Sequence, residues 1–261
     1  DENMKEETTV ALVDIDDDKD LDLFVGDKNG GISFYRNSGA ENNYLYTLDN
    51  ENNPFNLINA LELNYTAPTF VDIDDDGDLD VFIGTLSGNL YYFENIGTAS
   101  SALFLQVDIQ GLPFSIESHL ALKISFGDVD NDGDYDVLFG KLNGSLSYYE
   151  NIGTSVNANF TFNSIDENPF TTITTGSRTS PFLYEIDGDG FIDLLIGNAY
   201  GEVNLYLTKE VDGKRFFEFQ KTVSEQLKLM DLGQNSTPVL GDINNDGFPD
   251  LISGNKAGEV K

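Results

Sequence analysis

Acidic loops and unbroken apolar runs follow one another along the chain, and the pair returns five times. The segments are DIDDDKDLDLFVG, DIDDDGDLDVFIG, DVDNDGDYDVLFG, EIDGDGFIDLLIG and DINNDGFPDLISG, which start at Asp14, Asp72, Asp128, Glu185 and Asp242, 56 to 58 residues apart. A glycine turn and an aromatic segment follow most copies, as in GNLYYFENIG from Gly88. Recurrence at a nearly constant period indicates a repeat architecture.

Each unit is predicted to form four short strands. In the second unit these strands cover residues 67–73, 79–85, 89–95 and 103–109. The second strand of each unit is a continuous apolar run, which is typical of a strand buried on both faces. Prolines lie four residues before three of the loops and suit a strand start or an edge strand; they are Pro68, Pro181 and Pro238. Helical periodicity is weak, and its best stretch is Ser224–Leu232.

Repeated four-stranded units predict an all-β fold, a β-propeller in which blade packs on blade. The expected units of this single propeller region are 9–65, 66–122, 123–178, 179–235 and 236–261, with the fifth incomplete. An NPF or LPF element marks the first three units at Pro54, Pro113 and Pro169, whereas the fourth has Gln226 near that place. Since no strand is available to complete the fifth unit, we expect either a fragment of a longer chain, which is favoured, or blade edges open to a neighbouring chain.

Charge and composition narrow the classes of function. The chain has 14 Lys+Arg against 46 Asp+Glu, a formal net charge of −32. This balance excludes a nucleic-acid-binding protein, which needs a basic face, and argues against docking on anionic lipid. No apolar run is long enough to insert into a membrane. Cysteine is absent and His119 is the single histidine, so thiolate and histidine-rich metal sites are excluded.

The acidic loops have the composition of a calcium site. In the second loop, carboxylates stand at positions 1, 3, 5 and 9, which are Asp72, Asp74, Asp76 and Asp80. Gly77 at position 6 permits a positive φ, so the chain can reverse around an ion and direct the carbonyl of position 7 inward. Six or seven hard oxygens favour Ca²⁺ over Mg²⁺, which demands a stricter octahedron. Without a cation, so many carboxylates in one loop would repel one another.

An EF-hand begins in a similar way but requires a bidentate Glu at position 12 and flanking helices. Here position 12 is Val25, Ile83, Phe139, Ile196 or Ser253, and the flanks are strands. The pattern D-x-D-x-D-G-x-x-D before an apolar strand instead resembles the FG-GAP/VCBS-type repeats, the blades of integrin-α-like calcium-binding β-propellers. This resemblance covers nearly the whole chain and implies one Ca²⁺ per blade, up to five in total, in a secreted or cell-surface protein.

The side-chain ligands that the resemblance implies are Asp14, Asp16, Asp18 and Asp22; Asp72, Asp74, Asp76 and Asp80; Asp128, Asp130, Asp132 and Asp136; Glu185, Asp187, Asp189 and Asp193; and Asp242, Asn244, Asp246 and Asp250. The implied carbonyl ligands belong to Asp20, Asp78, Asp134, Phe191 and Phe248.

The five loops are not equivalent. The first has Lys19 where the others have glycine, which places a cation near the metal and a side chain where a positive φ is expected. The fourth begins with the longer Glu185, and the fifth replaces one carboxylate with Asn244. We therefore predict that the second and third loops bind Ca²⁺ most tightly.

Four N-x-S/T sequons are candidate glycosylation sites in a secreted glycoprotein, at Asn64, Asn143, Asn159 and Asn235. The aromatic strands could stack sugars, but the preferred interpretation is that residues such as Tyr91, Tyr92 and Tyr148 alternate between blade-to-blade contacts and the solvent edge.

The leading functional prediction is a non-catalytic extracellular module for adhesion or molecular recognition, with a protein or glycan ligand. Two alternatives stay open: a structural subunit of a surface layer or fibre that self-associates through open blade edges, and a lectin-like carbohydrate-binding propeller. Some polysaccharide-degrading propellers carry similar repeats. We predict no enzymatic activity, because metal binding accounts for every acidic cluster and no nucleophile or nucleotide loop stands out.

Overall fold

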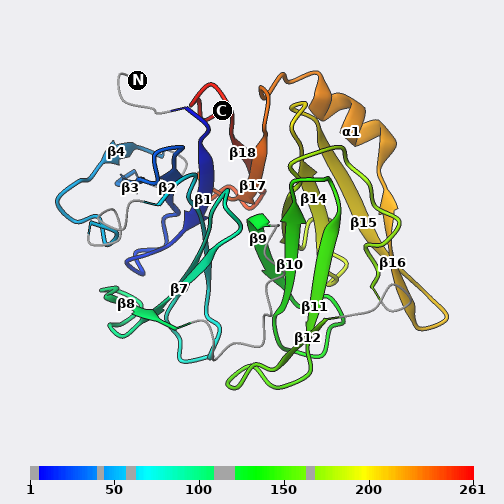
Figure 1. Cartoon of the computed structure of the whole chain (residues 1–261), viewed down its shortest axis with the longest axis horizontal. Helices are drawn as coiled ribbons and strands as arrows, with labels where there is room; N and C mark the ends of the chain where they lie inside the picture. Colours follow the sequence, from blue (N-terminus) through cyan, green and yellow to red (C-terminus); the bar gives the residue numbers. More distant parts are fainter. Residues whose placement is uncertain (1–5, 40–43, 57–62, 109–120, 163–167) are drawn as a thin grey trace.

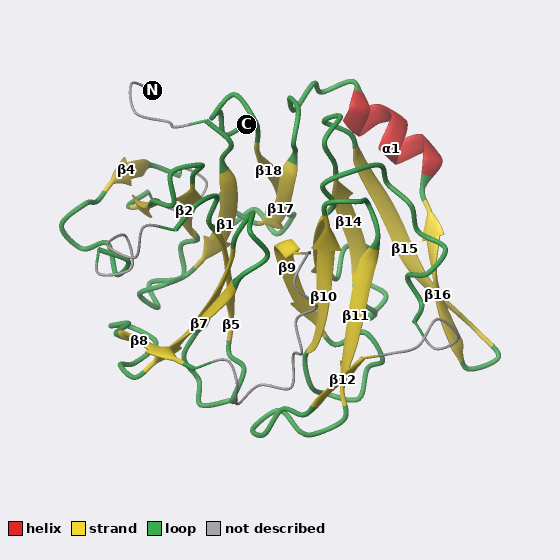
Figure 2. Ribbon diagram, viewed as in Figure 1, coloured by secondary structure: helices red, strands yellow, loops and turns green. Residues whose placement is uncertain are grey.

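The computed structural model describes residues 6–39, 44–56, 63–108, 121–162 and 168–261 (Figure 1). Pro113, with its LPF element, and His119 lie outside these residues. The described part is all-β apart from one short helix (Figure 2). Four sheets have four antiparallel strands each, and a fifth sheet has two. The structure thus confirms a propeller of four-stranded blades, but it shows four such blades and a small sheet where five repeat units are expected.

Each blade is a meander whose strands pair in chain order. The first contains β1 (Thr9–Val13), β2 (Asp22–Gly26), β3 (Ile32–Asn37) and β4 (Tyr46–Leu48). The second contains β5 (Ala67–Val71), β6 (Asp80–Gly84), β7 (Leu90–Asn95) and β8 (Phe104–Val107). The third contains β9 (Ala121–Gly127), β10 (Asp136–Lys141), β11 (Leu146–Asn151) and β12 (Phe160–Phe162). The fourth contains β13 (Ser180–Tyr184), β14 (Asp193–Gly197), β15 (Val203–Val211) and β16 (Lys214–Phe219), and the small sheet pairs β17 (Thr237–Gly241) with β18 (Asp250–Gly254).

Strand order and burial follow the hydrophobic pattern. The strands of the second blade agree with the predicted ranges to within two residues at each end. The second strands β2, β6, β10 and β14 are buried at every position or, in β10, at all but the last, as continuous apolar runs require. The proline-bearing strands β5, β13 and β17 are edge strands, so the missing proline N–H leaves no ladder bond unmade.

The first strands of the five sheets surround a common axis. Each first strand contacts the next: β1 contacts β5, β5 contacts β9, β9 contacts β13 and β13 contacts β17. A contact between β17 and β1 closes the ring. In Figure 1, β9 and β17 lie in the middle of the molecule, and the last strands β4, β8 and β16 lie at its outside. Every acidic loop joins a first strand to a second strand, so all five loops leave the inner strands at the same end of the propeller.

The first blade packs against the small sheet as the blades pack against one another. The Thr8 N–H donates to the Asn255 carbonyl at 2.9 Å, and the Thr66 N–H donates to the Asp27 carbonyl at 3.2 Å at the next junction. At both junctions the threonine hydroxyl also donates to the preceding sheet. The two ends of the described chain thus lie side by side (Figure 1).

The NPF elements contribute the aromatic core between the outer strands. Phe55 and Phe170 are 0% and 1% exposed. Phe55 stacks on Phe104 with ring centroids 5.2 Å apart, and Phe170 stacks on Phe217 at 4.5 Å. Asparagine side chains fix both backbones, since Asn53 and Asn168 each accept the N–H of the following phenylalanine at 2.9 Å.

The diverged fourth copy contains a helix instead of an NPF element. Helix α1 (Lys221–Lys228) packs against β15 (Figure 2), and its Ser224 hydroxyl accepts the Leu205 N–H at 3.0 Å. The helix starts three residues before Ser224, the first residue of the stretch with the best helical periodicity, and ends at Lys228 within that stretch. Among the described residues, no helix has the length and apolar character needed to span a membrane.

Candidate metal centre

The carboxylate at loop position 1 organises the loop backbone. In the second loop, the two Asp72 oxygens accept the N–H groups of Asp76 at 3.1 Å and Gly77 at 3.0 Å. The same pair of hydrogen bonds recurs from Asp14, Asp128 and Asp242. Glu185 departs from this pattern, because its longer side chain accepts the Gly188 N–H instead. A shared hydrogen-bond pattern gives four of the five loops one local geometry.

Two positions in each loop adopt left-handed backbone conformations. Position 6 has positive φ throughout, from 74° at Lys19 to 100° at Gly133, as the glycine pattern predicts. Position 4 also has positive φ, which the sequence analysis missed; the residues are Asp17, Asp75, Asn131, Gly188 and Asn245. The signal was present, since Asn, Asp and Gly tolerate this region best.

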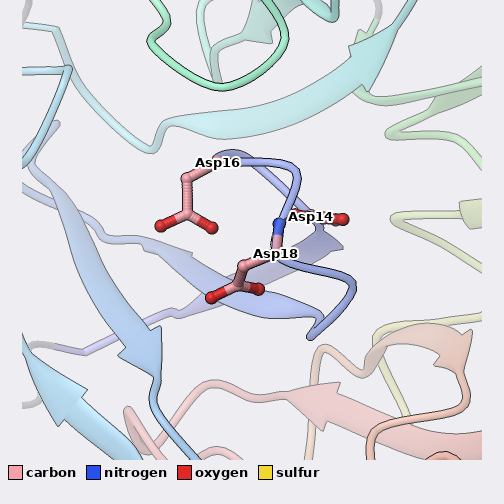
Figure 3. Close-up of side chains that lie close together, drawn as sticks. All are labelled: Asp14, Asp16 and Asp18. Atoms are coloured by element: carbon pink, nitrogen blue, oxygen red, sulfur yellow. Dashed lines mark hydrogen bonds between the residues drawn. The ribbon is translucent and has the colours of Figure 1, made fainter.

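These turns bring the carboxylates of positions 1, 3 and 5 together. In each of the first three loops one oxygen from each of the three acids lies within 4.8 Å of the others: Asp14, Asp16 and Asp18; Asp72, Asp74 and Asp76; and Asp128, Asp130 and Asp132. Figure 3 shows the three side chains of the first loop. In the fourth loop the converging acids are Glu185, Asp187 and Asp193. In the fifth, Asn244 takes the place of one carboxylate.

The aspartate at position 9 is buried at the base of the hairpin. Asp80, 2% exposed, accepts the Asn95 N–H at 2.7 Å and the Tyr92 hydroxyl at 2.9 Å. Asp136 has the equivalent partners Asn151 and Tyr148. Tyr92 and Tyr148 are thus buried, whereas the adjacent Tyr91 and Tyr149 are half-buried, in agreement with the preferred interpretation. The two buried tyrosines also hold this carboxylate.

The first blade lacks this tyrosine. Its third strand has Phe34 in register with Tyr92 of the second blade. Consequently the Oδ2 atom of Asp22 is buried without a hydrogen-bond partner among the described residues. The sequence analysis did not connect the aromatic strand with the acidic loop.

Burial and crowding raise the pKa values of several carboxyls in the first three loops. Burial is the main cause for Asp22, Asp80 and Asp136, whose pKa values rise to about 7. Burial, followed by repulsion from neighbouring carboxylates, also raises the pKa values of Asp74 and Asp130. Each of these groups is harder to ionise than a free aspartate. A cation bound in the loop would stabilise the ionised carboxylates and lower their pKa values.

The side chains at position 7 add to the acidic character of the second and third loops. Asp78 and Asp134 are 9% and 7% exposed, and an Oδ1 atom of each is buried without a hydrogen-bond partner among the described residues. Burial and the neighbouring loop carboxylates raise the pKa of Asp134 to about 6. Unpaired buried oxygens beside converging carboxylates fit a hard divalent cation such as Ca²⁺.

Protein cations lie beside the first, third and fourth loops. At the third loop, the Arg215 guanidinium donates to the backbone carbonyl of Asp130. The Arg36 guanidinium forms an ion pair with Asp16 and lies 3.3 Å from Asp49. Lys209 lies 3.7 Å from Asp187 and 3.9 Å from Asp189. Sequence analysis identified Lys19 but missed these three, because the pairing and packing of strands, rather than chain proximity, bring them to the loops.

The sequons differ in exposure. Asn64, Asn143 and Asn159 are exposed. Asn235 is half-buried, and its side-chain amide donates to Glu7 at 3.1 Å. An amide held in this way is the least accessible of the four to a modifying enzyme, and glycosylation at all four stays a prediction.

Comparison with known proteins supports the repeat pattern. The FG-GAP-like repeat family matches residues 72–139 and 185–253, a little over half of the chain. No curated protein matches the chain. Among solved structures, an Agrocybe aegerita lectin described as specifically recognising non-reducing terminal N-acetylglucosamine aligns with a TM-score of 0.44 and 19% identity. The alignment covers 95% of this chain and 60% of the lectin chain, so this chain spans only that part of the lectin's length.

Proposed function

Because the chain belongs to the FG-GAP-like repeat family, we propose that it is a non-catalytic extracellular propeller that binds Ca²⁺ in its hairpin loops and serves adhesion or molecular recognition. The observation that carries the proposal is the convergence of three carboxylates in each of the first three loops, with raised carboxyl pKa values and unpaired buried oxygens around them. All the converging acidic groups found in the described chain lie in these hairpin loops.

Bound Ca²⁺ would offset the repulsion between carboxylates and tie the first strand of a blade to the second. Positions 1, 3, 5 and 9 would supply side-chain oxygens, and position 7 would supply its carbonyl. The family's FG-GAP repeats are typical of extracellular proteins, where millimolar calcium can fill sites of modest affinity. A rigid ring with all loops at one end leaves the remaining surfaces available for a protein or glycan ligand.

The loops should differ in affinity. The second and third have glycine at position 6 and a buried carboxylate at position 7. Among the described residues no Lys or Arg forms an ion pair with their loop carboxylates, although Arg215 donates to the Asp130 backbone carbonyl of the third loop. Arg36 and Lys19 already supply positive charge at the first loop, and Lys209 supplies it at the fourth. We therefore expect the second and third loops to fill first.

Calorimetric titration of the decalcified chain with CaCl₂, together with elemental analysis, tests the proposal. Asp74→Asn and Asp130→Asn should each remove one of the tight sites and lower the melting temperature in calcium. Asp212→Asn, an exposed acid in the β15–β16 turn, is the matched control and should change neither. Absence of stoichiometric Ca²⁺, or five equal affinities, would contradict the assignment or the ranking respectively.

The two alternative functions, a lectin-like propeller and a layer or fibre subunit, have separate tests. Glycan-array binding that disappears after decalcification would support a lectin-like propeller, and sedimentation showing large assemblies would support a layer or fibre subunit. Discrete monomers without glycan binding would leave recognition of a protein ligand as the working function.

A further inference from the structure

The inner strands of the five sheets enclose a cavity of about 520 Å³ on the propeller axis. This is within the range of small-molecule sites, roughly 300–1,000 Å³. Its walls are largely apolar, with Leu12, Phe70, Phe126 and Phe182 contributed by four different sheets. The mouth lies at the loop end, where Asp242 and other loop residues line it.

A single lysine lies at the far end of this cavity. Lys123 occupies the start of β9, in the register position that Thr9, Ala67, Ser180 and Thr237 occupy in the other sheets. Its side chain is therefore the one long, charged group at this position, and the other four are small. Lys123 is 6% exposed and lines both the cavity and a narrower space beyond it. Since the inner strands run toward the loops, the amine lies about four residues, or roughly 13 Å, from the mouth.

The Lys123 ammonium has little compensation for its burial. Nζ donates to the Val10 carbonyl at 3.3 Å, which occupies one of its three donors. No described carboxylate forms an ion pair with it. On the narrow side, Glu7 is already paired with Arg178 at 2.5 Å and accepts from Asn235. At the mouth, Lys19 and Asp242 are separated from it by the length of the strand. Burial alone lowers the pKa of Lys123 to about 7.

We propose that the axial cavity binds a small amphipathic carboxylate, with the carboxylate on Lys123 and the apolar tail along the inner strands toward the mouth. A carboxylate would occupy the remaining ammonium donors and supply the missing counter-charge, while the aromatic and aliphatic walls would bury the tail. The net charge of −32 opposes entry of an anion, so binding is strongest when calcium has reduced that charge. The inference rests on the cavity and the lysine, and it does not depend on the recognition function.

Calorimetry with octanoate and the uncharged octan-1-ol, in calcium-containing buffer, tests the site. Wild-type chain should bind octanoate at least about tenfold more tightly than octan-1-ol, the range expected for a buried charge-assisted hydrogen bond. Lys123→Met should abolish this preference while retaining octan-1-ol binding. Lys214→Met, at an exposed hairpin position, is the matched control and should behave as wild type.

A second measurement uses the wild-type chain alone, in case Lys123→Met fails to fold. In ¹³C-lysine NMR, the Cε signal of Lys123 should titrate near pH 7 in the free chain and at higher pH with octanoate bound. Equal affinity for octanoate and octan-1-ol, octanoate binding that survives Lys123→Met, or a Lys123 titration that octanoate leaves unchanged would overturn the proposal. So would the absence of octanoate binding at millimolar concentration.

Discussion

The decalcified chain should become more stable as the pH falls from about 7 to about 5. Asp22, Asp80 and Asp136 have folded-state pKa values of about 7, against about 4 for an aspartate in an unfolded chain. Between these values the folded chain binds more protons than the unfolded chain. The associated stability is fully present below pH 4 or so and is lost as the pH rises through about 7.

The size of the effect follows from the number of such groups. One buried carboxyl changes the free energy of unfolding by up to about 1.4 kcal/mol per pH unit, and three together by up to about 4 kcal/mol per unit. Even about 1 kcal/mol per unit would raise the melting temperature by roughly 4–8 °C over two pH units in a chain of this size. Added calcium should oppose this trend, because protons and Ca²⁺ compete for the loop carboxylates.

The assay is thermal and urea unfolding of chain stripped on a chelating resin, at several pH values and in about 0.5 M NaCl. At that ionic strength, general repulsion among surface carboxylates is largely screened, whereas the burial of the three aspartates is unaffected. Asp136→Asn should flatten the pH dependence by roughly a third, because one titrating group is removed. A midpoint that is flat, or highest at alkaline pH, in the decalcified wild-type chain would refute the burial-based account.

Three further predictions concern the packing that supports the loops, and each is measured by urea unfolding. Phe34→Tyr should stabilise the decalcified chain by about 1 kcal/mol by giving Asp22 a hydroxyl partner. Tyr92→Phe should destabilise it by about 1–3 kcal/mol because Asp80 loses its hydroxyl partner. If both variants changed the free energy of unfolding in the same direction, the role of a tyrosine–aspartate hydrogen bond would be contradicted. Phe170→Ala should cost about 3–5 kcal/mol, since the ring is 1% exposed and stacked on Phe217; a loss below about 1 kcal/mol would show that the NPF element is not part of the core. Gly144→Ala should destabilise far more than Gly213→Ala: both positions have positive φ, but a Cβ on Gly144 would lie 1.4 Å from the Gly176 carbonyl oxygen, whereas one on Gly213 meets nothing within 4 Å. Similar losses for the two glycine variants would mean that the junction between these blades opens easily.

Local sequence determined much of this protein. Alternating loops and apolar runs predicted the strands to within two residues in the second blade, and Gly77 with its counterparts predicted the left-handed turns. These features depend on neighbours along the chain, since burial on both faces demands an apolar run and a positive φ demands glycine or a close substitute. The converging acids of positions 1, 3 and 5 belong to the same class, because one loop of a few residues contains them all.

What the tertiary structure decided involves partners that are distant in sequence. Arg36 reaches Asp16 and Tyr92 reaches Asp80 only because strands pair across a blade. Thr8 meets Asn255 because the blades turn around one axis, a relation no local pattern encodes. No local pattern distinguishes Lys123, because its amine is enclosed only when five inner strands assemble around the axis. Chain proximity therefore specified the loops, and packing between distant strands specified their charge balance and the cavity.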